Sequence, residues 1–148
     1  MENLSKKEEL IFLIKFIDKE FKKDFESRLS EYGLTSQQGR LLFYISCNTK
    51  SGKKVRQVDI ENHFKLTKST VHGLIDRMEK ASLIIKVKEG GNQYIAISNK
   101  TEGILTHVFD KRTECIDKML QGISDDEIET LHQLLTKIYS NKDKGGNC

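Results

Sequence analysis

Residues 66–98, LTKSTVHGLIDRMEKASLIIKVKEGGNQYIAIS, contain two different hydrophobic periodicities in succession. In the first half, the apolar residues are spaced 3, 1 and 3 positions apart, which predicts a helix from an N-cap at Thr67 to about Lys80. In the second half, the runs LIIKVK and QYIAIS flank EGGN, which predicts a β-hairpin. A helix followed directly by a hairpin is therefore expected. The apolar helix positions predicted to be buried are Val71, Leu74, Ile75 and Met78.

Two residues of the predicted helix are unfavourable in an isolated helix. Lys68 would lie in the first turn, where the helix macrodipole favours a carboxylate. Gly73 would lie in the interior, at a cost of about 1 kcal/mol relative to alanine. Both suit a helix that meets a polyanion, because a helix N-terminus binds phosphate and glycine lets another backbone approach closely.

Two shorter helices are predicted before this stretch. Thr35 and Gln38 form a capping box for a helix from Ser36 to about Cys47, and a polar loop, NTKSGKK, follows at 48–54. A short helix at about 56–63 then ends in the tight turn FKL. Two short helices joined by such a turn and followed by a hairpin are typical of a winged helix-turn-helix.

Long apolar helices are predicted at both ends of the chain. The stripe on the first helix, at about 5–30, is wider than a surface helix needs, which indicates a second partner such as another subunit. Ser98 can cap a long helix with apolar positions as far as Ile123, and Ser124 with Glu127 opens a last helix. We therefore predict a mainly α fold with a small β-hairpin wing and N- and C-terminal dimerisation helices. The expected parts are a winged helix-turn-helix at 34–100, a helical dimerisation region at 1–33 and 101–142, and a disordered tail at 143–148.

The charge of the chain is unevenly distributed. The 148 residues carry a net charge of +3, but residues 50–90 alone hold ten basic and five acidic side chains. Local positive charge of this kind is typical of a nucleic-acid surface. A solvated basic face of no function remains the alternative on charge alone.

Other classes of protein find no support in the sequence. The apolar cluster LIFLIKFI at 10–17 is too short for a membrane span and lacks the features of a signal peptide, so a cytoplasmic protein is expected. The three cysteines and four histidines show no metal-ligand spacing, and there is no nucleophile-base pairing or phosphate loop. We expect no cofactor, no metal and no enzymatic activity.

The predicted second helix of the motif carries the candidate DNA contacts. In this motif its N-terminal residues face base edges and phosphates in the major groove. Thr67 has the alternative role of a simple cap, His72 and Arg77 can instead pair with nearby carboxylates, and Gly73 can relieve crowding against the preceding helix. The candidates on this helix are Thr67, Lys68, Ser69, Thr70, His72, Gly73 and Arg77.

A hairpin of this type can enter the minor groove as a wing. Lys86 and Lys88 are two residues apart and so share one strand face, and Asn92 and Gln93 follow near the tip. These four residues are the candidate wing contacts, with an ordinary solvated hairpin as the alternative.

Several stretches resemble the MarR family of bacterial transcriptional regulators. GLTSQQGRLLFYI is similar to its second helix, VDIENHFKLTKSTVHGLIDRMEKASLIIK to its helix-turn-helix and wing entry, and ISDDEIETLHQLLTKI to its closing helix. The resemblance implies a homodimer on a pseudo-palindromic double-stranded DNA operator, often a repressor released by a small aromatic effector. It places recognition-helix contacts on residues 68–77 and a basic wing residue on Lys86. The chain departs from the family at Ser82 and Thr101, where glycine is common, and in EGGNQ, which has neither the aspartate nor the arginine of many wings.

The effector site and the thiols are predicted less directly. Phe12, Phe16 and Tyr44 lie on helices that would border a cleft for an effector, although core packing is the alternative for each. Some family members sense oxidants through a cysteine, but no neighbour in sequence would lower the pKa of Cys47. We expect Cys47 and Cys115 to be buried structural thiols and Cys148 to be a thiol in the tail.

The sequence thus favours a sequence-specific DNA-binding regulator. Such a regulator should bind a short pseudo-palindrome more tightly than random DNA. The alternative from another class is a winged-helix protein-interaction module that does not read DNA, which the arginine-free wing motivates.

Overall fold

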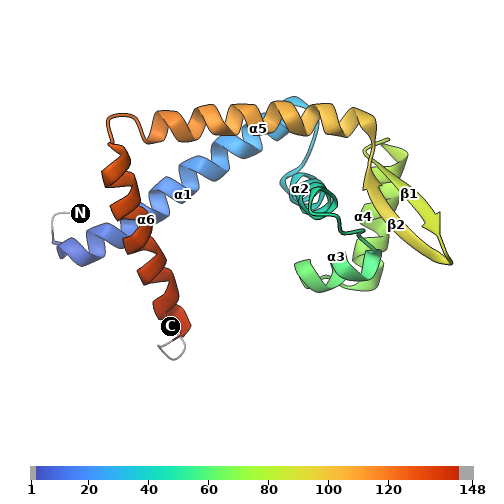
Figure 1. The fold of residues 1–148 in the computed structure, drawn as a ribbon, viewed down its shortest axis with the longest axis horizontal. Helices are drawn as coiled ribbons and strands as arrows, with labels where there is room; N and C mark the ends of the chain where they lie inside the picture. The colour runs from blue at the N-terminus through green and yellow to red at the C-terminus, as the bar shows by residue number, and fades with distance from the viewer. Residues whose placement is uncertain (1–2, 144–148) are drawn as a thin grey trace. The chain divides into compact units, whose positions relative to one another are not determined.

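The computed structural model describes residues 3–143 and contains six α-helices, one 3-10 turn and one hairpin within that range (Figure 1). Along the chain, three helices are followed by a turn, a fourth helix, the hairpin, two more helices and a short final turn. The elements are α1 (Lys6–Glu31), α2 (Ser36–Lys50), α3 (Gln57–Phe64), α4 (Lys68–Lys80), β1 (Ile84–Glu89), β2 (Asn92–Ile97), α5 (Asn99–Met119), α6 (Asp125–Ser140) and the 3-10 turn η1 (Asn141–Asp143).

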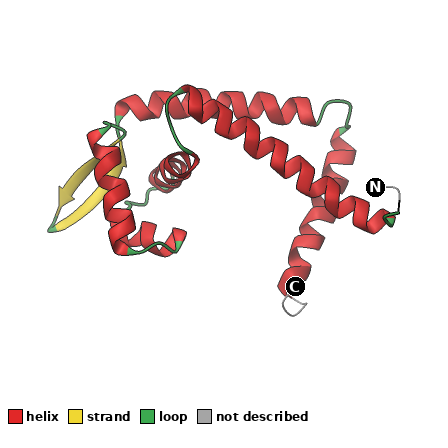
Figure 2. Ribbon diagram, turned by 180° about the vertical axis from the view of Figure 1, so that it is seen from behind, coloured by secondary structure: helices red, strands yellow, loops and turns green. Residues whose placement is uncertain are grey.

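Residues 3–113 and 114–143 form two compact units. The first contains α1 to α4, the hairpin and most of α5, and Figure 2 shows α4 running alongside the hairpin within it. The second contains the last turn of α5 and α6. The boundaries expected at 33/34 and 100/101 remain predictions.

The core of the first unit confirms the predicted helix faces. Val71, Leu74, Ile75 and Met78 of α4 are all buried, with at most 4% of any of them exposed. They pack with the inward residues of α2 and with Leu29 at the end of α1. A Cβ at Gly39 would overlap the Leu29 side chain, so α1 and α2 approach closely there because residue 39 has no side chain. The inward residues of α2 are Leu41, Leu42 and Ile45.

The hairpin is the predicted one, with one addition. β1 and β2 pair antiparallel from Ile84↔Ile97 to Glu89↔Asn92, which leaves Gly90 and Gly91 as the two-residue turn. Both glycines have positive φ, as a turn of this kind requires. Val55 adds a short third edge, since its carbonyl accepts a 2.7 Å hydrogen bond from the Ile95 amide.

Two departures from the family pattern have a structural reason. Ser82 adopts a left-handed conformation with φ of 60°, which explains why glycine suits this position. Thr101 is fully buried, and its hydroxyl donates a 2.7 Å hydrogen bond to the Leu83 carbonyl. Ser98 caps α5 as predicted, because its Oγ accepts from the Thr101 amide.

Several predicted boundaries were wrong. α5 ends at Met119 and not near Ile123, because the chain turns at 120–123, where Gly122 has positive φ. α2 continues to Lys50, three residues beyond the predicted end, and therefore includes part of the expected loop. Asp143 of the predicted tail belongs to η1, and residues 144–148, with Cys148, lie outside the described residues.

Candidate nucleic-acid interface

The helix-turn-helix is formed by α3 and α4. The turn between them places Lys65 in the left-handed region, with φ of 53°, and Thr67 then caps α4 by accepting a 3.2 Å hydrogen bond from the Thr70 amide. The Gln57 side chain donates to the Lys68 carbonyl at 3.4 Å, which joins the beginnings of α3 and α4. The predicted capping role of Thr67 is confirmed.

α4 has one buried and one exposed face. The polar residues Lys68, Ser69, Thr70, His72 and Arg77 are all exposed, opposite the buried apolar face. The Thr70 hydroxyl accepts a 2.7 Å hydrogen bond from the Thr67 hydroxyl, so cap and candidate contact are linked. The structure therefore gathers the predicted recognition residues on one accessible surface.

Gly73 lies on this surface with helical backbone. A Cβ added there would have only one atom within 4 Å outside the local helix backbone, the Arg77 Nη1 at 3.3 Å. Gly73 is thus not explained by crowding against α3. Its absence of a side chain leaves room for the Arg77 guanidinium and for a close approach to α4.

A chain of ion pairs joins α4 to the wing. His72 Nε2 lies 3.2 Å from Asp76 Oδ2, and Lys86 Nζ lies 2.9 Å from Asp76 Oδ1 and 3.3 Å from Glu79 Oε1. The hydrogen bond from Lys86 lowers the pKa of Asp76, and the same bond raises the pKa of Lys86. Lys86 is half buried, and its ammonium group is paired with these two carboxylates of α4.

The tip of the wing is more accessible. Lys88, Asn92 and Gln93 are exposed, and Lys88 lies opposite Gln93 in the strand register. Lys86 and Lys88 share a strand face by spacing, but only Lys88 is free of a carboxylate partner among the described residues.

The loop between α2 and α3 adds basic residues that the sequence analysis did not select. Lys54 pairs with Glu89 at the wing tip and lies 5.3 Å from the centre of the Tyr94 ring. Arg56 Nε lies 3.7 Å from Asp59 Oδ2, and Lys53 is exposed. The basic run SGKKVR at 51–56 is visible in the sequence, but its position beside the hairpin depends on the bridge between Val55 and Ile95.

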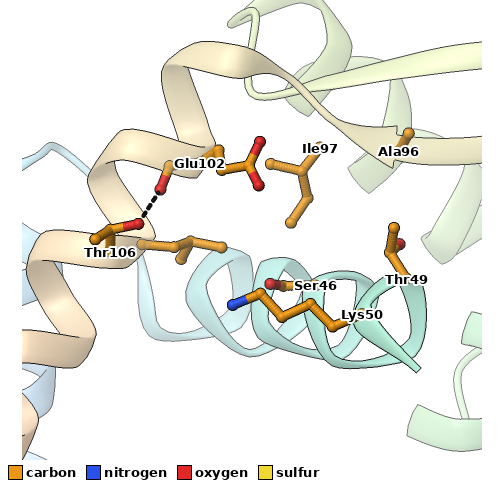
Figure 3. A pocket seen from close by; sticks show the side chains of 8 residues that line it. Ser46, Thr49, Lys50, Ala96, Ile97, Glu102 and Thr106 are labelled. Carbon is orange, nitrogen blue, oxygen red and sulfur yellow. Dashed lines mark hydrogen bonds between the residues drawn. The ribbon is translucent and has the colours of Figure 1, made fainter. Parts of the chain in front are cut away.

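The three aromatic residues predicted for an effector lie on two helices, Phe12 and Phe16 on α1 and Tyr44 on α2. Phe12 and Phe16 stack on each other along α1 with centroids 6.2 Å apart, whereas Tyr44 stacks on His63 at 4.3 Å. A separate hollow of about 130 Å³ lies between α2, β2 and α5 (Figure 3). Ile97 and Leu105 contribute apolar surface to it, and Lys50 and Glu102 contribute opposite charges.

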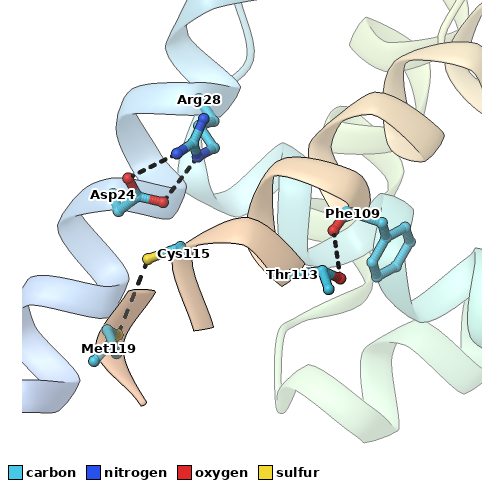
Figure 4. A network of polar contacts seen from close by, with 6 residues as sticks. All are labelled: Asp24, Arg28, Phe109, Thr113, Cys115 and Met119. Atoms are coloured by element: carbon cyan, nitrogen blue, oxygen red, sulfur yellow. Dashed lines mark hydrogen bonds and ion pairs between the residues drawn. The ribbon is translucent and has the colours of Figure 1, made fainter. Parts of the chain in front are cut away.

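The prediction of buried thiols was wrong for Cys47, which is exposed because it falls on the outer side of α2, and Cys115 is half buried. Cys115 Sγ lies 4.0 Å from Met119 Sδ, and on α1 the Arg28 guanidinium pairs with Asp24 (Figure 4). Within residues 3–143 no cluster of three or more histidine, cysteine or carboxylate side chains is arranged to hold a metal. None of the described helices combines the length and apolar content needed to cross a bilayer.

These elements define a winged helix-turn-helix protein, and comparison with known proteins narrows the class. Residues 32–93 match the model of the MarR family. A MarR family protein from Bacillus stearothermophilus has a TM-score of 0.74 and 26% identity, over 91% of this chain and 94% of that chain. Residues 32–93 are thus similar to the MarR family, whose members are transcription regulators and not enzymes.

Two further solved structures share the fold. MepR, a transcription regulator of the Staphylococcus aureus multidrug efflux pump MepA, has a TM-score of 0.74 at 22% identity, over 88% of this chain and 96% of that chain. The MepR–DNA complex has a TM-score of 0.69 at 22% identity, over 93% and 99%. Comparison with curated proteins gives no match.

Proposed function

We propose that the protein is a homodimeric, sequence-specific DNA-binding repressor of a pseudo-palindromic operator. The observation that carries this proposal is the exposed face of α4, which presents five polar side chains and a glycine whose added Cβ would meet only Arg77 Nη1 outside the local helix backbone. The five are Lys68, Ser69, Thr70, His72 and Arg77. A helix of this kind can enter the major groove with its N-terminal end. The MepR–DNA complex shows that a protein of the same fold binds DNA.

The charges around α4 support the proposal. Lys68, Arg77 and Lys80 of α4 have no carboxylate within ion-pair distance among the described residues, and neither has Lys65 in the turn before it. Their charges are therefore available to phosphates. Phosphate contacts would set the register on DNA, and base-edge contacts from Thr70 or His72 would give specificity.

The Asp76 carboxylate prepares His72 for such a contact. Because His72 Nε2 lies 3.2 Å from Asp76 Oδ2, the imidazole ring is oriented and Nδ1 remains for a contact with a base edge. We include Lys88, Asn92 and Gln93 of the wing as weaker minor-groove contacts.

The dimer is supported by apolar surface on the two end helices. Leu13, Phe16 and Ile17 of α1 are each about half exposed, and so is Leu134 of α6. Exposed apolar side chains in such number mark a protein interface. A second copy of the chain would cover both helices.

A small effector would act through the hollow between α2, β2 and α5. Ile97 and Leu105 suit a compact aromatic compound, Lys50 and Glu102 could each pair with a polar group on it, and α5 extends from this hollow toward the C-terminal helix. Binding there would change the position of the wing relative to α5 and release the DNA.

The test is a double substitution, Lys68→Ala with Arg77→Ala, in a fluorescence polarisation assay. Affinity for a duplex selected by the protein from random sequences should fall at least tenfold. The control, Lys19→Ala with Lys23→Ala on α1, removes the same charge and should leave affinity unchanged.

The second candidate is a winged-helix interaction module without DNA readout. It is favoured by Lys86, the expected wing cation, being paired to Asp76 and Glu79. Unchanged nucleic-acid affinity of the Lys68→Ala, Arg77→Ala protein would support this module and reject the regulator.

A further inference from the structure

A second basic surface lies where the α2–α3 loop meets the hairpin. The α2–α3 loop, the end of α2, the start of α3 and β2 border an open hollow of about 660 Å³. Lys53, Lys54 and Arg56 line it against a single carboxylate, Asp59, and two tyrosines, Tyr44 and Tyr94, complete its wall.

The side chains of this hollow are arranged as anion donors. The Tyr44 and Tyr94 hydroxyls have no hydrogen-bond partner among the described residues. Burial raises the pKa of Tyr44, and the charge of Asp59 raises it further, so this phenol keeps its proton and can donate. Arg56 contacts Asp59 through Nε and its own amide, which leaves its two terminal nitrogens for another acceptor.

The hollow is tied to both DNA-reading elements. Arg56 is the residue before α3, and the next residue, Gln57, donates to the Lys68 carbonyl at the start of α4. Lys54 pairs with Glu89 at the wing tip, and the Val55 carbonyl is bound by β2. The loop is thus fixed between α4 and the wing.

We infer that this hollow is a DNA-backbone phosphate site, in which Lys53 and Arg56 contact a phosphate between the groove read by α4 and the groove met by the wing. The hollow is wide, open and mostly polar, which fits one segment of a polyanion better than an enclosed small molecule. This inference rests on the proposed DNA-binding function. The hollow also supplies cations from the α2–α3 loop for contact with phosphate, whereas Lys86 of the hairpin is paired with Asp76 and Glu79.

The test is the salt dependence of DNA binding between 50 and 200 mM. Each phosphate contact contributes about 0.9 to the slope of log affinity against log salt. Because Lys53 and Arg56 share one phosphate in each protomer, Lys53→Gln with Arg56→Gln removes two phosphate contacts per dimer and should reduce the slope by about 1.8, and Lys53→Gln alone should reduce it by less. Affinity should fall by the same factor on selected and random duplexes, because phosphates carry no sequence information.

The controls separate this inference from the proposed function. The variant with Lys19→Gln and Lys23→Gln on α1 should have the same slope as the wild-type protein. The single variant Lys53→Gln keeps the Arg56–Asp59 contact, because Lys53 is an exposed loop residue without an ion pair among the described residues. A wild-type slope in both loop variants overturns the phosphate site even if the wild type prefers its selected duplex. Absence of that preference in the wild type rejects the proposed function, while the slope on random duplexes still decides the phosphate site.

Discussion

Replacing Gly73 by alanine should have opposite effects on stability and on DNA binding. The residue is in the interior of α4 with helical backbone, so alanine should stabilise the helix by about 1 kcal/mol. The new Cβ would meet only the Arg77 Nη1 at 3.3 Å, the far end of a flexible exposed side chain that can move aside. For a chain of this length, the gain corresponds to a rise in Tm of about 2–4 °C.

On DNA the same methyl group should be harmful. If the α4 backbone approaches the groove at Gly73, an added carbon in a packed contact costs about 1–3 kcal/mol, or about fivefold to 150-fold in affinity. Gly103→Ala is the matched control, since Gly103 is also a helical glycine with nothing within 4 Å of its added Cβ. It should raise the Tm similarly and leave binding unchanged.

Thermal unfolding by circular dichroism and polarisation binding measure the two effects. A Gly73→Ala protein that is less stable than wild type would refute the geometric reasoning. A stabilised protein with unchanged DNA affinity would refute the close approach at this position.

Three further substitutions test separate parts of the structure. Ser82→Gly should stabilise the fold by about 0.5–1 kcal/mol in chemical denaturation, because the left-handed strain of Ser82 exceeds the entropic cost of glycine; a loss of stability would contradict this. Asp76→Asn should reduce stability at neutral pH but not in acid: the pKa of Asp76 is lowered from 3.8, so its contribution is present above that value and disappears as the pH falls through the lowered pKa. Equal differences from wild type at every pH would reject the ion pair with Lys86. Leu134→Glu should shift the protein from dimer to monomer in sedimentation, and an unaltered dimer would place the interface elsewhere.

Much of the fold follows from local patterns in the sequence. The apolar faces of α2 and α4 and the glycine turn of the hairpin were predicted correctly, because each depends on periodicity or on backbone conformation within a short stretch. The caps at Thr35 and Ser124 were found for the same reason, since a capping box spans only four residues. The end of α5 was not, because apolar spacing continues through Leu120 and Ile123 although the chain has already turned.

The features of the interface that were missed depend on contacts between distant residues. Lys86 was selected as a wing contact from its spacing, and its hydrogen bond to Asp76, ten residues earlier, was not foreseen. The basic residues of the α2–α3 loop lie beside the hairpin because Lys54 pairs with Glu89 and Val55 bridges to Ile95, and neither contact can be read from residue spacing. Side-chain pairing across elements is set by the fold, so residue spacing alone does not predict it.

The most direct test of the account is the ratio of affinities for a selected pseudo-palindromic duplex and for random duplex at physiological salt. A sequence-specific regulator that presents α4 to the major groove should show a ratio of about 10³ or more. The selected sequence should have two half-sites about one helical turn apart, as a two-fold symmetric dimer requires. A ratio near one, with a properly folded dimer, would contradict the central claim.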